Sequence, residues 1–185
     1  MKQNASQTVG PYLRIGLIYG GEKQTNLVRE GTTGEQILIT GVVYDGEGVP
    51  ITDAMIEIWQ PDAQGIFNHP NDPKQAEADP TFRGFGRSET RNEGVFQFKT
   101  IKPGSQNGDA PYINVNVFAR GMLVHAITRI YFSDEAANEA DPVLSALAPE
   151  QQQTLIATRD DSGDLPTYHF DIRVQGDQET VFFNP

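Results

Sequence analysis

The side chains best suited to binding a metal ion in this sequence are three histidines, His69, His125 and His169. None of them belongs to a His-x-His or His-x-x-x-His pair, and the chain has no cysteine. A mononuclear metal site usually needs two or three such side chains, or carboxylates, that converge on one point. Taken alone, these residues predict isolated histidines that are exposed or half-buried, and no metal centre.

Other catalytic motifs are missing from the sequence as well. It contains no Gly-x-Ser-x-Gly, no Walker loop and no Gly-x-Gly-x-x-Gly ahead of an expected helix. Acid pairs such as Asp134-Glu135 and Asp160-Asp161 are plentiful, and we expect most of them at the solvated surface. The string Gly84-Phe85-Gly86-Arg87 predicts a tight turn or a close approach of two backbone segments.

Arg129 and Trp59 are the two large side chains whose positions call for an explanation. Arg129 lies in the middle of an apolar run, where an arginine is rarely buried unless it is paired. It either pairs with a surface acid, packs its stem along the sheet, or points its planar guanidinium at an anionic ligand. Trp59, the only tryptophan, lies in an expected strand and is predicted to belong to the core.

Short strands separated by turn signals must position these side chains. Tyr112–Ala119 alternates cleanly, with Ile113, Val115 and Val117 on one face. The expected strands are Gln36–Asp45, Ala54–Gln60, Val95–Ile101, Tyr112–Ala119, Val124–Phe132, Tyr168–Val174 and Thr180–Phe183. This spacing predicts an all-β fold, a sandwich or a barrel.

The segments between the strands contain few residues that favour helices. Short helices are expected after Ser133 as far as Glu139, from Asp141-Pro142, and over Ala148–Thr154. Gly20–Gly34 and Asn68–Pro80 are irregular and polar, and they are expected to be long surface loops of the kind that often carries function.

Length and charge restrict the class of protein further. The 185 residues are expected to form a single domain over residues 1–185, and the formal net charge of −11 argues against nucleic acid or an anionic membrane as a partner. No apolar run approaches the roughly 20 residues that cross a bilayer, and the first residues lack the apolar stretch of a signal peptide. A cytoplasmic protein is therefore expected.

Seven strings occur along the chain in one order, and together they are far more specific than any of them alone. They are SQTVGPY (6–12), GVVYDGEGVPITDAMIEIWQPDAQGIF (41–67), FRGFGR (82–87), TIKPG (100–104), FARG (118–121), TRIYF (128–132) and FDIRVQGDQETVFF (170–183). With them the chain resembles the intradiol ring-cleaving dioxygenases, and within that family the alpha-type subunit of two-chain members. The resemblance extends from Ser6 to Phe183 and is poorest in the two irregular loops.

The resemblance implies a β-sandwich enzyme that uses non-haem ferric iron and O2 to cleave a catechol between its two hydroxyl-bearing carbons. In the catalytic chain of that family, two tyrosines and two histidines hold the iron. Here the tyrosine positions are Phe67 and Gln106, and the His-x-His triplet begins at Tyr112 and ends at Asn114. Phenylalanine has no donor atom, and amides are weak ligands for a hard ferric ion. The resemblance therefore implies that this chain binds no metal and that a partner beta subunit holds the iron.

The resemblance also implies that this chain lies beside the partner's active site. Alpha and beta subunits of like fold would pair, and the pairs would form a larger hetero-oligomer, with residues 1–35 as an arm that contacts the partner. The implied substrate-binding residues are Arg129, Gly10, Pro11 and Tyr12. The implied substrate, protocatechuate, carries a carboxylate that suits a guanidinium. Gly10-Pro11 would form a rigid wall, and a simple turn is the alternative.

Two other functions are consistent with the same residues. One is a non-enzymatic β-sandwich binding module, and the other is a homomeric iron enzyme with unusual ligands. A neighbouring reading frame that encodes a sister chain with both tyrosines and the His-x-His would favour the two-chain enzyme. A visible tyrosinate–iron absorption band from this chain alone would favour the homomeric enzyme.

Overall fold

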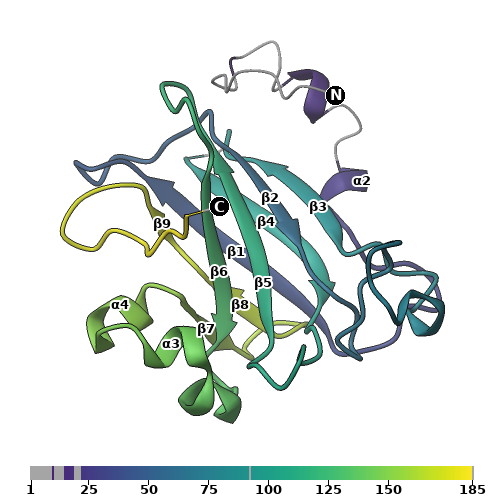
Figure 1. The fold of residues 1–185 in the computed structure, drawn as a ribbon. Coiled ribbons are helices and arrows are strands. Elements are labelled where there is room, and N and C mark those ends of the chain that lie inside the picture. Colours follow the sequence, from purple (N-terminus) through teal and green to yellow (C-terminus); the bar gives the residue numbers. More distant parts are fainter. Residues whose placement is uncertain (1–9, 11–14, 19–21, 92, 185) are drawn as a thin grey trace, which may run out of the picture.

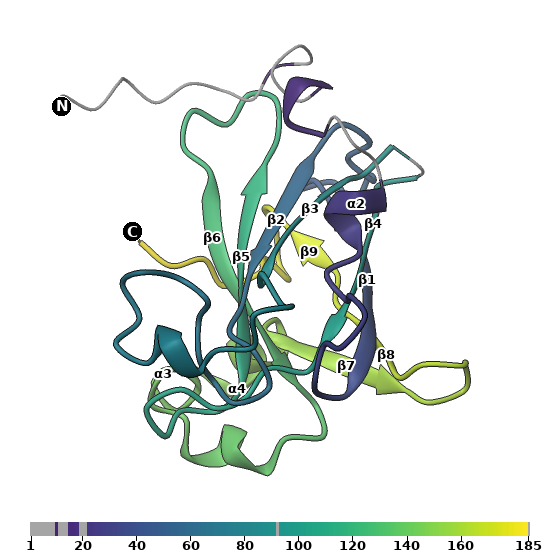
Figure 2. The ribbon, with the colours of Figure 1, turned by 90° about the vertical axis from the view of Figure 1, so that its right-hand side faces the viewer.

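Two β-layers packed face to face form the framework of the chain (Figures 1 and 2). The computed structural model describes residues 10, 15–18, 22–91 and 93–184. The first layer contains, in spatial order, β3 (Phe85–Glu89), β2 (Met55–Trp59), β5 (Tyr112–Phe118) and β6 (Ala126–Phe132). The second contains β7 (Ile156–Asp160), β8 (Thr167–His169), β1 (Gln36–Tyr44) and β4 (Val95–Ile101), with β9 (Ile172–Arg173) also paired to β1. The parallel pair β6–β7 connects the layers.

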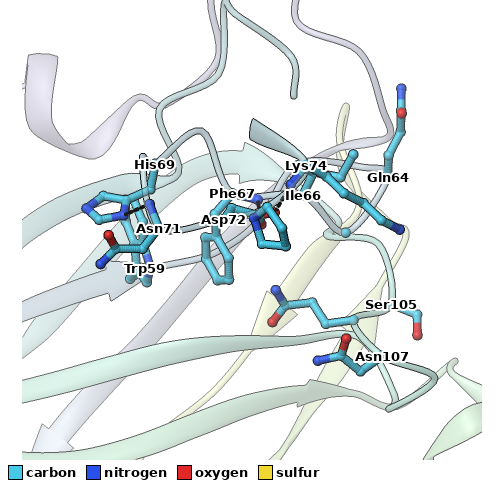
Figure 3. Close-up of a pocket in the computed structure, with 13 residues that line it drawn as sticks. Trp59, Gln64, Ile66, Phe67, His69, Asn71, Asp72, Lys74, Ser105 and Asn107 are labelled. Atoms are coloured by element: carbon cyan, nitrogen blue, oxygen red, sulfur yellow. Dashed lines mark hydrogen bonds between the residues drawn. The ribbon is translucent and has the colours of Figure 1, made fainter. Parts of the chain in front are cut away.

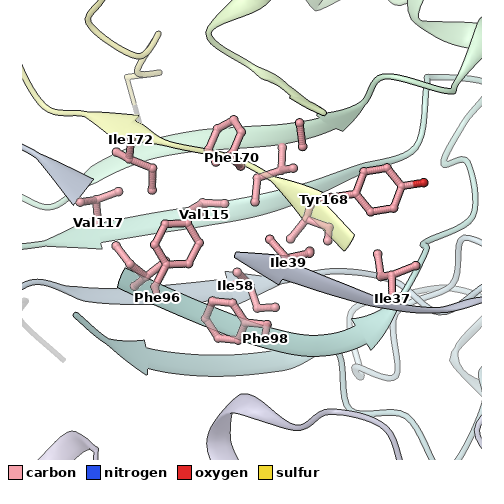
Figure 4. Packing of buried hydrophobic residues seen from close by; sticks show 14 of the residues in the cluster. Ile37, Ile39, Ile58, Phe96, Phe98, Val115, Val117, Tyr168, Phe170 and Ile172 are labelled. Carbon is pink, nitrogen blue, oxygen red and sulfur yellow. The ribbon is translucent and has the colours of Figure 1, made fainter. Parts of the chain in front are cut away.

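Strict alternation of side chains along the strands produces the core. Alternate residues of β1 and of β5 are buried, and their neighbours are only partly covered. Ile39, Phe98 and Val115 are fully buried and meet between the layers, as Figure 4 shows. Burying each such side chain contributes about 1.5–3 kcal/mol, so the inner faces fix the register of the two layers.

Helical segments are short and lie outside the layers. They are α2 (Glu22–Thr25), the 3-10 segments η1 (Gln75–Glu77) and η2 (Ala136–Ala140), α3 (Pro142–Ser145) and α4 (Pro149–Gln153). Asp141 caps α3, because its Oδ1 accepts hydrogen bonds from the backbone N–H groups of Val143 and Leu144 at 2.9 and 3.0 Å. None of the helices in the described ranges has the length and apolar character to cross a membrane.

The all-β sandwich predicted from the strand spacing is confirmed, although several element boundaries differ. The string Gly84-Phe85-Gly86-Arg87, expected to be a tight turn or a close approach of two backbone segments, leads into strand β3, and Gly84 does lie against the backbone, where a Cβ would be 2.1 Å from the carbonyl oxygen of Gln60. Strand β7 was not predicted. The last expected strand, Thr180–Phe183, is reduced to an isolated bridge between Phe183 and Ile127. The short helix expected after Ser133 begins later, with Glu135 at its N-cap and no capping bond from that side chain.

Candidate functional site

A pocket of about 440 Å³ opens at the end of β2, between the loop that follows this strand and the turn after β4 (Figure 3). The positions that the resemblance matched to the two iron-binding tyrosines, Phe67 and Gln106, both line it. The residues around the pocket are Trp59, Gln64, Gly65, Ile66, Phe67, His69, Asn71, Asp72, Pro73, Lys74, Ser105, Gln106 and Asn107. The structure thus brings together two positions that are far apart in sequence.

Asp62, only 3% exposed, holds the walls of this pocket in place. Its Oδ1 accepts hydrogen bonds from the backbone N–H groups of Gln64 and Ile66 at 2.9 and 3.0 Å, and its Oδ2 accepts one from Asp79 at 2.8 Å. Its backbone carbonyl accepts a further bond from the N–H of Gly104. One buried aspartate therefore connects three segments: its carboxylate joins the loop after β2 to the segment before β3, and its backbone carbonyl binds the turn after β4.

Glycine allows these segments to approach closely. Gly65 has a φ of +82°, and a Cβ there would lie 2.0 Å from the carbonyl oxygen of Ser105. A Cβ on Gly104 would lie 2.5 Å from the carbonyl oxygen of Ala63. Any larger residue at either position would push the two walls of the pocket apart.

Aromatic rings form the inner wall of the pocket. The rings of Trp59 and Phe67 stack with centroids 5.2 Å apart and planes 8° from parallel, and His69 meets Trp59 edge-on at 6.0 Å. Trp59 is half-buried on the outer face of its layer, so the prediction that it belongs to the core is wrong. His69 Nδ1 accepts a hydrogen bond from the backbone N–H of Asn71 at 3.2 Å, which fixes the ring beside Trp59.

The carboxylate of Asp72 binds backbone N–H groups of its own loop. Its Oδ2 accepts a hydrogen bond from the backbone N–H of Phe67, and its Oδ1 accepts one from that of Lys74. These backbone bonds, with that of Lys74 the stronger, lower the pKa of Asp72 below its usual value. Asp72 therefore stays ionised while it shapes the rim of the pocket.

The other two positions matched to iron ligands, Tyr112 and Asn114, lie on the same outer face but do not line the pocket. Asn114 pairs in register with Trp59 of β2 on one side and with Arg129 of β6 on the other. Directly opposed residues in an antiparallel pair point to the same face, so Asn114 lies between the pocket and Arg129. Tyr112 lies beneath the guanidinium of Arg129, whose Cζ is 4.0 Å from the ring centroid.

The donor set at these four positions does not fit a ferric ion. Phe67 offers no donor atom, Gln106 and Asn114 offer neutral amides, and the Tyr112 ring is covered by a cation. Across the described ranges, no three His, Cys, Asp or Glu side chains group in a way that could hold a metal ion.

Arg129 belongs to a hydrogen-bonded chain that runs into the protein. Its Nη1 donates to the hydroxyl of Tyr131 at 3.2 Å, and that hydroxyl donates to Oδ1 of Asp141 at 3.3 Å. The Phe183 ring also lies 5.4 Å from its guanidinium. Burial acts to lower the pKa of Arg129, but the hydrogen bond to Tyr131 and the electrostatic effects of Tyr112, Tyr131 and Asp141 outweigh it. The net effect raises the pKa above its usual value, so the side chain stays charged.

Of the three N-terminal residues that the resemblance implies to bind substrate, the structure describes only Gly10. Pro11 and Tyr12 lie outside the described residues. Gly10 is described, and a Cβ added to it would meet no atom within 4 Å.

Two residues that matter for this site were not singled out from the sequence. Asp62 belongs to a Pro-Asp-x-x-Gly turn string, and this pattern is the signal of a carboxylate that binds its own loop. Asp141 was predicted to begin a helix, but the bond that its Oδ2 accepts from the backbone N–H of Ala110 at 3.2 Å joins residues too distant in sequence to be foreseen.

Comparison with known proteins gives consistent results. A family model described as a dioxygenase matches residues 12–176. The protocatechuate 3,4-dioxygenase alpha chain of Burkholderia cepacia is 43% identical, with 100% of this chain and 98% of the relative covered. The alpha chain of Pseudomonas putida is 40% identical, covering 100% and 97%. The beta chain of Burkholderia cepacia is 32% identical over 84% of this chain and 71% of the relative.

Solved structures resemble the chain in fold. The intradiol ring-cleavage dioxygenase from Tetranychus urticae superposes with a TM-score of 0.67 at 21% identity, covering 97% of this chain and 98% of that one.

Proposed function

The chain belongs to the intradiol ring-cleavage dioxygenase family, and from this premise we propose that it is the alpha subunit of a protocatechuate 3,4-dioxygenase. The single observation that supports this proposal most strongly is full-length similarity to two alpha chains, at 43% and 40% identity. The similarity to a beta chain is weaker and covers less of that relative, at 32% identity over 71% of it.

The family is iron-dependent, and the iron of this enzyme belongs in our proposal to a beta subunit. The donor chemistry at Phe67, Gln106, Tyr112 and Asn114 supports this assignment, because these side chains do not form a ferric site. When bound in the partner, iron supplies the chemistry by which O2 opens the ring between the hydroxyl-bearing carbons. The present chain contributes assembly and part of the substrate pocket.

In this proposal Arg129 attracts and orients the substrate carboxylate. Its guanidinium lies on the outer face of the first layer, remains charged, and is held by Tyr112 and Tyr131. A cation pre-positioned in this way loses little conformational freedom when it binds an anion. The resemblance also assigns substrate-binding roles to Gly10, Pro11 and Tyr12, and in this proposal alpha–beta pairs assemble into a larger oligomer in the cytoplasm.

Co-expression with a beta chain that carries both tyrosines and the His-x-His tests the proposal. We expect a stable complex that contains about one iron per alpha–beta pair and cleaves protocatechuate. The matched control is the beta chain expressed alone. Ring cleavage by the present chain alone, or no association with the beta chain, would contradict the proposal, and the second result would favour a non-enzymatic binding module.

A further inference from the structure

A second pocket, of about 230 Å³, lies between the segment after α2 and the beginning of β3, at the edge of the first layer. Its lining consists of Gln24, Asn26, Leu27, Arg29, Arg83, Phe85, Gly86 and Arg87. Three of the nine arginines of a chain with a net charge of −11 thus surround one small cavity. Such a local excess of positive charge in an acidic protein attracts anions.

The three guanidinium groups differ in what they already bind. Arg87 is paired with Glu57 at 2.6 Å and also donates to the carbonyl oxygen of Leu17 at 3.1 Å. Arg29 and Arg83 are exposed, and within the described part of the chain neither has a carboxylate in ion-pair range. Acid partners are present for four other cations of the described chain: Arg91, Arg120, Arg159 and Lys102.

The remaining walls favour an anion with a carbon skeleton. The side-chain Oδ1 of Asn26 accepts a bond from the backbone N–H of Val28, which leaves its amide nitrogen as a donor. The free polar groups of Arg29, Arg83 and Asn26 are therefore all donors. Phe85, 38% exposed, and Leu27 add apolar surface.

The backbone at this place is held close by a glycine. A Cβ on Gly86 would lie 2.7 Å from Cδ1 of Leu27, so the segment after α2 rests directly on β3. Arg29 is carried by the first segment, and Arg83 comes just before the strand. The two arginines therefore belong to the two segments that this contact holds together.

From this arrangement we propose that the pocket binds a small polycarboxylate. Each free guanidinium offers a planar fork for one carboxylate, and the cavity leaves room for a carbon chain between them. The identity of the ligand class rests on the proposed function. Cleavage of a ring bond between two hydroxyl-bearing carbons places both atoms of O2 in the product and converts those carbons into two carboxyl groups. The site would then be a product site on the alpha subunit.

Calorimetric titration of the full chain, alone or in its complex with the beta subunit, tests this proposal. The probes are cis,cis-muconate, benzoate and inorganic phosphate at constant ionic strength. The test variant is the double substitution Arg29→Gln and Arg83→Gln. The matched control is Arg120→Gln, which also removes an exposed guanidinium but lies outside the pocket.

We expect saturable binding of the dicarboxylate, weakened at least about tenfold in the double variant and unchanged in the control. In the complex, the double variant should lose one class of sites per alpha chain while ring cleavage of protocatechuate persists. Three results would each overturn the proposal: no saturable binding, equal binding by the double variant, or phosphate binding as tight as that of the dicarboxylate. Ring cleavage is measured separately, so failure of this site and failure of the proposed function can be distinguished.

Discussion

Arg129 serves the fold through three contacts and still presents a charge to the surface. It lies over Tyr112, approaches Phe183 and bonds Tyr131, whose hydroxyl continues to the capping carboxylate of Asp141. Burial raises the pKa of Tyr131 to about 12, despite the opposing effect of Arg129, so the hydroxyl remains a donor at neutral pH. The same contacts that stabilise the layer would hold the guanidinium ready for an anionic ligand.

At the level of this residue, we expect Arg129→Ala in the assembled enzyme to weaken protocatechuate binding by roughly 1.5–3 kcal/mol, about 10–150-fold. Arg129→Lys should recover only part of the loss, because a point charge lacks the planar fork. Catechol, which has no carboxylate, should respond little, and the iron content should not change. Steady-state cleavage of both substrates measures the effect. Equal impairment of the two substrates would make Arg129 purely structural.

Asp79 predicts a pH dependence of stability. Burial alone would raise its pKa, but hydrogen bonds from the backbone and side chains of Thr33 and Thr81 lower the pKa to about 2. A carboxylate whose folded pKa lies below its unfolded value stabilises the protein above the unfolded pKa, and this stabilisation is lost as pH falls through the folded pKa. The contribution is about 1–2 kcal/mol at neutral pH after allowance for solvent screening.

Urea unfolding of wild type and Asp79→Asn at pH 7, 5 and 3 checks this expectation. Wild type should lose stability between pH 5 and 2, and the variant should be less stable at pH 7 with a flatter profile. Asp164→Asn, on an exposed loop, is the control. Parallel pH profiles for wild type and Asp79→Asn would show that other carboxylates dominate.

At the level of elements, the pocket at the end of β2 depends on the contact between two turns. Gly65→Ala introduces a Cβ 2.0 Å from the carbonyl oxygen of Ser105 at a φ of +82°. We expect it to destabilise the chain by about 3–5 kcal/mol. Gly48→Ala, at a φ of +78° with no atom within 4 Å, should cost only about 1 kcal/mol.

Chemical unfolding of the two alanine variants, followed by the fluorescence of Trp59 at the pocket wall, makes this comparison. Because both glycines have positive φ, the difference between the variants isolates the contact between the turns. Similar losses in the free energy of unfolding at both positions would mean that the contact between the turns contributes little to stability.

Strands in which every second residue is apolar and buried could be predicted from sequence. Strands that form only because neighbouring strands supply their hydrogen bonds could not. β4 was expected over Val95–Ile101 and has those bounds, because one face of it enters the core at every second residue. The glycines of β3 predict a tight turn or a close backbone approach; the close approach is present, but the strand itself depends on pairing with β2. β7 could not be predicted from sequence because its burial pattern does not alternate regularly; it is defined by its pairing with β6 and β8.

The same distinction applies to the candidate site. The positions of Phe67 and Gln106 came from motif order, and the structure places both at one pocket. The prediction that Trp59 belongs to the core was wrong because an aromatic side chain in a strand can point to either face of the sheet. Only the pairing with Asn114 and the stacking on Phe67 show that it points to the outer face. The role of Asp62 depends on bonds to Asp79 and Gly104, which no local pattern contains.

For the whole molecule, the donor set leads to a prediction about metal content. The purified chain should hold no stoichiometric iron and show no visible tyrosinate–iron band, because Phe67, Gln106 and Asn114 are poor or absent ligands. Metal analysis and an absorption spectrum of the chain alone test this, with the co-expressed complex as positive control. About one tightly bound ferric ion per chain would contradict it.

The exposed apolar side chains lead to a prediction about association. At the tip of the β5–β6 hairpin, Leu123 and Val124 are 69% and 56% exposed, and Figure 2 shows this hairpin projecting beyond the body of the sandwich. The outer face of the first layer adds the half-buried rings of Trp59 and Tyr112. Apolar surface of this kind is stabilised by about 25 cal/mol for each Å² removed from water, so a partner of like fold would gain from covering it.

We therefore expect the chain alone to self-associate or to be poorly soluble, and to become monodisperse when it is co-expressed with its beta partner. Light scattering coupled to gel filtration, over a range of protein concentrations, measures this. Replacing Leu123 and Val124 together by serine should reduce self-association of the chain alone, whereas Val49→Ser, at a site that is 53% exposed on a different turn, should have less effect. A stable monomer at high concentration would argue against an obligate hetero-oligomer, because a surface evolved for a permanent partner is not expected to stay uncovered in water.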